Sequence, residues 1–128
     1  MDHEAVPAFT GGKTTKEKTM GRMSREKGKR GEREVAALLC FLGYEASRGQ
    51  QFHGGPDSPD VVGLPGIHIE VKRTEKLALY EAMEQSQRDC GEGELPIVVH
   101  RRNGKKWVVC MRFEDFMQLY KKWQEERP

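Results

Sequence analysis

Two carboxylates and a lysine lie close together in residues 59–72, which read PDVVGLPGIHIEVK. Aliphatic and polar side chains alternate over residues 67–72, a pattern that is typical of a β-strand. Side chains two residues apart lie on one face of a strand, so Glu70 and Lys72 are predicted to project together, away from the aliphatic face. The intervening Leu-Pro-Gly turn predicts a hairpin that brings Asp60 near this pair.

These three side chains have the chemistry of a hydrolytic metal site. Hard divalent cations such as Mg²⁺ prefer oxygen ligands and commonly take one or two protein carboxylates. Such a cation polarises a phosphate oxygen and activates water, while a nearby ammonium group orients that water or offsets developing negative charge. The alternative interpretation is an exposed strand face on which Glu70 and Lys72 form an ordinary charged pair.

A helix is predicted over residues 24–42, with Ser24 as its N-cap and Gly43 at the position that ends it. Its apolar positions have the spacing of one helix face: Val35, Leu38, Leu39 and Leu42. Glu32 lies at the edge of that face, where a carboxylate needs a partner. Two interpretations of Glu32 stay open, a salt bridge to a neighbouring arginine or a role in the metal site.

The remaining patterns predict an α/β fold. Residues 44–48 are expected to form a first strand with Tyr44 and Ala46 inward. The elements expected after the hairpin are a helix over 77–89, strands over 96–100 and 106–111 joined by an Asn-Gly turn, and a helix over 113–126. Their predicted core residues are Leu79, Ala82, Met83 and Cys90 in the first helix, and Phe113, Phe116, Met117, Tyr120 and Trp123 in the last. This order predicts a central mixed β-sheet of about five strands flanked by helices.

Composition sets the class of protein. The chain has 128 residues, a length that is enough for one domain. Because 36% of the residues are hydrophobic and 33% are charged, the core is expected to be modest. The formal net charge is +2. It has no apolar run of the roughly 20 residues that cross a membrane, and no signal-peptide pattern. Three separated cysteines argue against a disulfide framework and a zinc site, and favour a reducing cytoplasm.

Basic residues are concentrated in residues 13–33 and 100–106, on either side of the acidic centre, which suits a nucleic-acid enzyme. Residues 1–22 are predicted to be a basic flexible tail that precedes a domain over residues 23–128. The polar loop of residues 49–58 is a candidate for substrate contact. Its candidate residues are Gln50, Gln51 and His53, and His53 is either a general base or a solvated side chain.

Three sequence elements together resemble the E…PD…ExK signature of the PD-(D/E)xK nuclease superfamily: Glu32, Pro59-Asp60 and Glu70-Val71-Lys72. Within it, the chain is similar to the archaeal-type Holliday junction resolvases and their phage relatives over about residues 24–112. The segments that carry this likeness are Lys27-Gly28 with Glu32-Arg33, which is similar to the KGxxxER opening helix, and Gly43-Tyr44-x-Ala46-x-Arg48, which resembles the first strand.

The resemblance implies a restriction-endonuclease-like three-layer sandwich and a metal-dependent endonuclease. By this likeness, Asp60 and Glu70 would bind Mg²⁺ or Mn²⁺, and the Val71 carbonyl would be a further ligand. Glu32 would complete the metal site or hold a second ion.

The resemblance also assigns roles around the metal. Lys72 would position the attacking water or stabilise the pentavalent phosphate, and Gln85 would form a hydrogen bond within the site. The residues expected to contact phosphates are Lys27, Lys29, Arg30, Arg33, Arg48, Arg73, Arg101 and Arg102.

A four-way DNA junction is the expected substrate, and the two cuts that resolve it imply a symmetric homodimer in the cytoplasm of a prokaryotic cell or a phage-infected host. One difference lies in the loop before PD, where the resolvases usually carry a serine. In this chain that loop contains Gln50, Gln51 and His53, and Ser58 stands next to the motif. Two alternatives stay open: a replication- or restriction-associated nuclease that cuts flap, nicked or duplex DNA, and a DNA-binding protein without catalysis.

Overall fold

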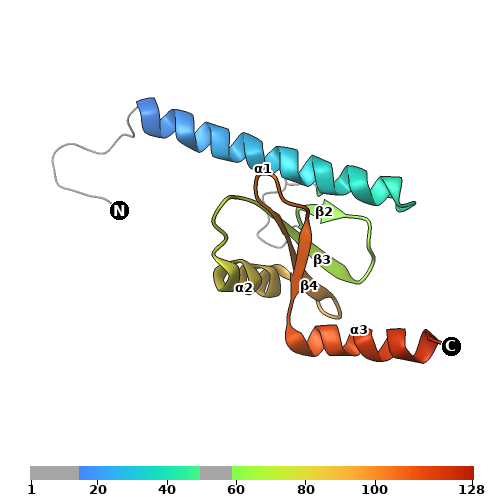
Figure 1. Ribbon diagram of the computed structural model, residues 1–128. Coiled ribbons are helices and arrows are strands. Elements are labelled where there is room, and N and C mark those ends of the chain that lie inside the picture. The colour runs from blue at the N-terminus through green and yellow to red at the C-terminus, as the bar shows by residue number, and fades with distance from the viewer. Residues whose placement is uncertain (1–14, 50–58) are drawn as a thin grey trace.

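The computed structural model describes residues 15–49 and 59–128 of the chain (Figure 1). Its elements are α1 (Thr15–Phe41), β1 (Ser47–Arg48), β2 (Val61–Val62), β3 (Ile67–Arg73), α2 (Leu79–Asp89), β4 (Leu95–Arg101), β5 (Val108–Met111) and α3 (Phe113–Glu126). Helices and strands follow one another in the predicted order. None of the helices in these described ranges has the length and apolar character needed to cross a membrane.

The five strands form one mixed sheet in the order β1-β2-β3-β4-β5. The central strands β3 and β4 run parallel, with Glu70 opposite Val98, and the other neighbouring strands are antiparallel. A parallel pair needs a long crossover connection, which α2 provides here. The predicted β2–β3 hairpin and the predicted mixed sheet are both confirmed.

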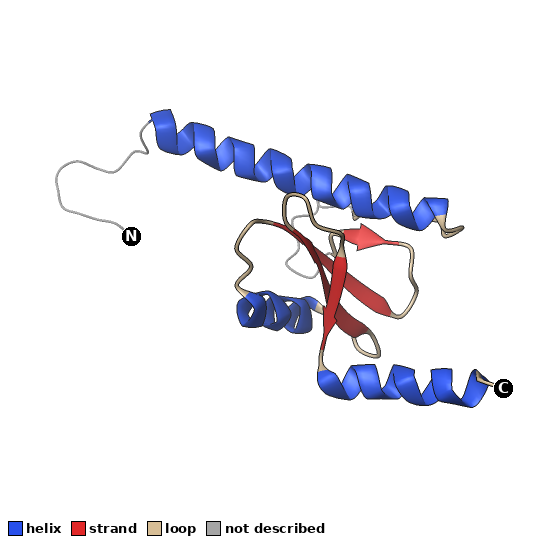
Figure 2. Ribbon diagram, in the orientation of Figure 1, coloured by secondary structure: helices blue, strands red, loops and turns tan. Residues whose placement is uncertain are grey.

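The two faces of β3 and β4 are covered by different helices. On one face, Val35 and Ala36 of α1 pack in a cluster with Val61, Ile69, Val71, Ile97 and Val99. On the opposite face, Ala82 and Met83 of α2 pack against Val98. Figure 2 shows α1 and α2 on opposite sides of the sheet. This arrangement confirms the three-layer α/β sandwich.

The first helix is longer than predicted and packs through different residues. It begins at Thr15 rather than at Ser24, so residues 15–22, which were expected to be part of the tail, are helical. Most of the side chains before Ser24 are good helix formers, and the sequence has no proline there to stop the helix. Leu38 and Leu42 were expected in the core but are exposed, because this end of α1 extends beyond the sheet (Figure 1).

At Gly31, α1 lies close to β3 and to the Trp107 ring. A Cβ atom added at Gly31 would lie 2.8 Å from the Cβ of Arg73 in β3 and 3.4 Å from the Trp107 ring. A side chain here would therefore push the helix away from β3. Glu32 is the next residue, so a glycine at position 31 also allows the Glu32 carboxylate to lie close to the sheet.

The first strand is shorter than predicted, and Tyr44 does not face inward. Gly43 has a φ of 102°, and the N–H of Tyr44 donates to the carbonyl of Leu39 at 3.0 Å. This is the hydrogen bond of a Schellman cap, so Tyr44 still belongs to the end of α1 and lies exposed. Ala46 does pack against the core, as expected.

The last two helices differ most from the predicted core. α2 begins at Leu79 rather than at residue 77, and Leu79 is 40% exposed, while Leu77 packs against the core in its place. The predicted core residues of α3 are all exposed: Phe113, Phe116, Met117, Tyr120 and Trp123. They are exposed because α3 leaves the edge of the sheet after β5 and runs away from it (Figure 1).

Candidate active site

Backbone hydrogen bonds of the β2–β3 hairpin place Asp60. Its N–H donates to the carbonyl of Ile69 at 2.9 Å, which fixes the backbone of Asp60 against β3. The N–H of Val71 donates to Oδ2 of Asp60 at 2.8 Å, so the side chain also reaches across to β3. The hairpin therefore brings Asp60 to the strand that carries Glu70, as the sequence predicted.

Glu70 lies on the face of β3 that α2 covers and is 2% exposed. The interpretation of an exposed strand face with an ordinary charged pair is therefore wrong. Burial raises the pKa of Glu70, and burial followed by the charge of Glu70 raises the pKa of Asp60 to about 6. Two neighbouring carboxylates with raised pKa values are an arrangement that a bound cation would stabilise.

Lys72 and Gln85 connect the strand to α2. The Nζ of Lys72 donates to Oε1 of Gln85 at 2.8 Å, which is the hydrogen bond expected of Gln85. The charge of Lys72 also acts on the neighbouring carboxylates, lowering the pKa of both Asp60 and Glu70 against the effect of burial. The ammonium group is thus held beside the two carboxylates by a side chain from another layer.

For Glu32, the structure confirms the salt-bridge interpretation, and a role in the metal site stays a prediction. It accepts a hydrogen bond from Nε of Arg48 at 2.9 Å, so the salt bridge to an arginine is present. Burial raises the pKa of Glu32, and the charge of Asp60 raises it further. Glu32 therefore lies within electrostatic reach of Asp60 while Arg48 holds it in place.

His68 is the residue of this site that the sequence analysis missed. Its side chain is 1% exposed, and its Nε2 lies 2.9 Å from Oε1 of Glu70. Its Nδ1 lies 3.9 Å from Oε1 of Glu94, in the segment before β4. The available signal was its position two residues before Glu70, on the same face of the same strand.

The donor set suits a hard divalent cation held by few protein ligands. Among the described residues, no three carboxylate, imidazole or thiolate groups come together in a complete metal cage. The pair Asp60 and Glu70 nevertheless fits Mg²⁺, which often binds through one or two carboxylates and keeps several waters. Val71 directs its N–H to Asp60, and the roles of the Val71 carbonyl and of Glu32 as ligands stay predictions.

Four of the predicted DNA-contacting residues bind acidic side chains of this chain. Lys27 lies 2.9 Å and Arg73 3.3 Å from Oε2 of Glu75. Arg101 pairs with Glu34 at 2.9 Å. Arg48, the fourth, holds Glu32 as described above. A phosphate bound by these side chains would share them with an acidic partner or displace that partner.

The other predicted contacts lie on exposed surface or outside the described residues. The exposed ones are Lys29, Arg30 and Arg33 on α1, and Arg102 after β4. The loop candidates Gln50, Gln51 and His53, together with Ser58, lie outside the described residues. Contact with DNA stays a prediction for all of them.

Comparisons with known proteins identify a family and a similar solved structure. A family model described as "Phage putative PDDEXK endonuclease" matches residues 23–128. The structure is also similar to that of Hjc, a Holliday junction resolvase from Archaeoglobus fulgidus, at 28% sequence identity and a TM-score of 0.49. That match covers 66% of this chain and 72% of the resolvase chain. No match is found among curated proteins.

Proposed function

Because this chain belongs to the phage PDDEXK endonuclease family, we propose that it cuts DNA by metal-dependent hydrolysis of phosphodiester bonds. One observation carries the proposal: the buried carboxylate of Glu70 and the partly buried carboxylate of Asp60 lie together beside the ammonium of Lys72. Buried charges of this kind cost stability, so their presence in one place favours a functional explanation over a structural one.

The two carboxylates are the proposed ligands of Mg²⁺ or Mn²⁺, with the Val71 carbonyl and Glu32 as further candidates. When bound, the cation would supply Lewis-acid polarisation of the scissile phosphate and a lowered pKa for a nearby water. Val71 and Ile69 fix Asp60 to β3 through their backbone groups, so the two carboxylates are held ready before a cation arrives.

Lys72 is the proposed catalytic cation. Water attacks the phosphorus in line with the leaving sugar oxygen, so one P–O bond forms while another breaks, and the leaving oxygen takes up a proton. The Lys72 ammonium either orients that water or stabilises the charge that develops on the phosphate oxygens. Gln85 positions Lys72 by accepting a hydrogen bond from its ammonium at Oε1.

A four-way DNA junction is the proposed substrate, and a homodimer in the cytoplasm of a phage-infected cell is the proposed form. The support is the sequence likeness to junction resolvases at Lys27-Gly28, Glu32-Arg33 and the Gly43–Arg48 segment. The exposed basic residues of α1 would contact the phosphates of the DNA arms. A dimer would place two sites on one junction, so both strands are cut in one complex.

The test is cleavage of labelled junction, flap, nicked and linear duplex DNA with Mg²⁺, and with EDTA as the metal-free control. We expect Mg²⁺-dependent cutting with a clear preference for the junction, and no cutting by a Glu70→Gln variant that still binds DNA. Equal cutting of linear duplex would contradict the junction assignment alone. Unchanged cutting by Glu70→Gln would contradict the metal site itself.

A further inference from the structure

The α3 helix carries a row of large apolar side chains that this chain does not cover. The exposed residues on the helix are Phe113, Phe116, Met117, Leu119, Tyr120 and Trp123. A helix of 14 residues is marginally stable in water unless its apolar face packs against something. The stacked rings of Phe116 and Tyr120, 6.4 Å apart, lie along this face, with Trp123 5.6 Å beyond Tyr120.

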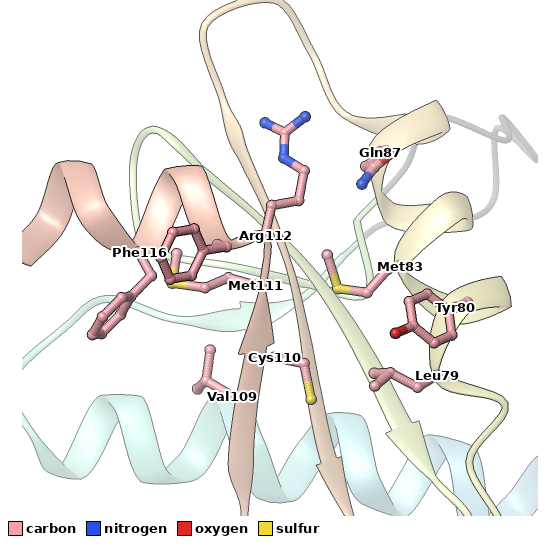
Figure 3. A pocket seen from close by; sticks show the side chains of 10 residues that line it. Leu79, Tyr80, Met83, Gln87, Val109, Cys110, Met111, Arg112 and Phe116 are labelled. Atoms are coloured by element: carbon pink, nitrogen blue, oxygen red, sulfur yellow. The ribbon is translucent and has the colours of Figure 1, made fainter.

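An apolar groove continues this row toward the body of the protein. The groove has a volume of about 640 Å³ and lies between α2, β5 and the start of α3 (Figure 3). Its apolar lining residues are Leu79, Tyr80, Met83, Val109, Met111, Phe113 and Phe116. The helix row and the groove share Phe113 and Phe116, so they form one surface, which we call the α3 face.

The α3 face is large enough to be an interface. Its five aromatic residues are between 37% and 78% exposed, and at roughly 200 Å² per aromatic side chain they present on the order of 600 Å². Leu79, Val109, Met117 and Leu119 add further exposed apolar area. The total approaches the roughly 800 Å² that each partner contributes to a standard interface, and it exceeds the typical largest patch of a monomer.

We propose that a second copy of this chain covers the α3 face, with the two α3 helices antiparallel about a twofold axis. The surface is self-complementary, because one part protrudes as aromatic side chains and the other part is a groove. With the axis at the middle of α3, close to Tyr120, Trp123 of one copy meets Phe116 of the other at the mouth of the groove. In a twofold interface the same surface of each copy meets that of the other, so each surface must both insert its aromatic side chains and accept those of its partner.

The biological role of this dimer rests on the proposed function, because cutting both strands of a junction requires two active sites. The groove is lined by none of Asp60, Glu70 and Lys72, so the proposed interface is separate from these three side chains. The association itself is measured without DNA, so a failed dimer and a failed nuclease are distinguishable. A Glu70→Gln variant without nuclease activity should remain dimeric.

The first experiment measures the mass of the full chain in solution by light scattering across a range of concentrations. We expect twice the 14.7 kDa mass of one chain, and a change to the single mass on Phe116→Asp substitution. The matched control is Phe41→Asp, because Phe41 is 86% exposed at the end of α1 and lies outside the α3 face. Phe41→Asp should leave the dimer intact, with a dissociation constant within about twofold of the parent.

A second experiment tests the twofold arrangement and guards against simple misfolding. Tyr120→Lys and Tyr120→Glu variants should each be folded monomers, because like charges meet at the axis. Mixing them should restore a dimer, since the opposite charges then face each other. A parent chain that stays monomeric at all concentrations would overturn the proposal. So would two folded variants that fail to associate, or a Phe41→Asp variant that dissociates as readily as Phe116→Asp.

Discussion

The imidazole of His68 contacts the carboxylate of Glu70, with 2.9 Å between Nε2 and Oε1, and both side chains are at most 2% exposed. Both residues lie on the face of β3 that α2 covers. A buried carboxylate needs hydrogen-bond donors, and an imidazole that donates from Nε2 supplies one. This contact leaves the other oxygen of Glu70 for Asp60 or a cation. We infer that His68 is a positioning residue that fixes the rotamer of Glu70, a proposed metal ligand.

Replacing His68 tests this role through the affinity for Mg²⁺. His68→Ala should weaken Mg²⁺ binding by about 10-fold or more, because the carboxylate loses its orienting donor, and His68→Gln should restore part of the affinity. The measurement is the Mg²⁺ dependence of the thermal unfolding midpoint, followed by calorimetric titration. His100→Ala is the matched control, because His100 binds the carbonyl of Thr74 instead of a carboxylate. A His68→Ala protein with parental Mg²⁺ affinity would contradict this positioning role.

Lys72 and Gln85 should separate chemistry from binding. Lys72→Ala is expected to lower the cleavage rate at saturating DNA by roughly 10²–10³-fold, with the DNA dissociation constant changed by less than about threefold. Gln85→Ala should lower the rate less, because Lys72 keeps its charge and loses only the 2.8 Å hydrogen bond that positions it. Single-turnover cleavage and equilibrium binding distinguish these effects. Loss of affinity with an unchanged rate in Lys72→Ala would contradict the assignment.

The order of the elements and the hairpin were readable because they depend on local patterns. Alternation over residues 67–72 and the Leu-Pro-Gly turn specify the β2–β3 pairing, and the pairing brings Asp60 to Glu70. The same alternation placed Lys72 beside Glu70, and the family signature supported Glu32, which already stood out at the edge of the apolar helix face, as a partner. What alternation could not reveal is that α2 covers the polar face of β3, which makes His68 and Glu70 buried rather than exposed.

The apolar pattern of the α3 helix was visible in the sequence, but the surface that it packs against was not. Its apolar spacing predicted a core face, and the same spacing is required of a helix that packs on another molecule. Only the path of the chain after β5 distinguishes the two cases. The pairing of Arg48 with Glu32 was likewise hidden, because the sequence does not reveal which of several arginines reaches that carboxylate.

Two arginines with different surroundings should affect DNA binding differently. Arg30 is exposed on α1, so Arg30→Ala should weaken binding and reduce the slope of log affinity against log salt by about one. Arg101 is paired with Glu34 at 2.9 Å and lies 5.6 Å from the centre of the Trp107 ring. Arg101→Ala should therefore change the salt slope less. Binding titrations at several salt concentrations measure both, and an equal loss of slope would show that DNA displaces Glu34.

The stability of the metal-free protein should fall as the pH rises from about 4 to 7. Asp60 has a pKa of about 6 when folded, mainly because of burial, against about 3.9 when unfolded. The folded state therefore holds this proton more tightly, and that contribution is complete below the unfolded pKa and lost as the pH rises through 6. A shift of this size corresponds to roughly 2–3 kcal/mol in the free energy of unfolding.

Asp60→Asn isolates this contribution from the other ionisable groups, because asparagine keeps an oxygen for the Val71 N–H but cannot ionise. In urea unfolding between pH 4 and 7, the variant should gain stability relative to the parent by roughly 2–3 kcal/mol. Mg²⁺ at pH 7 should stabilise the parent and narrow that gap, because the cation takes over the neutralising role of the proton, and it should have little effect on Asp60→Asn. A stability difference that stays constant across this pH range would mean that Asp60 is ionised throughout. Another group within the site would then have to offset the negative charges of Asp60 and Glu70.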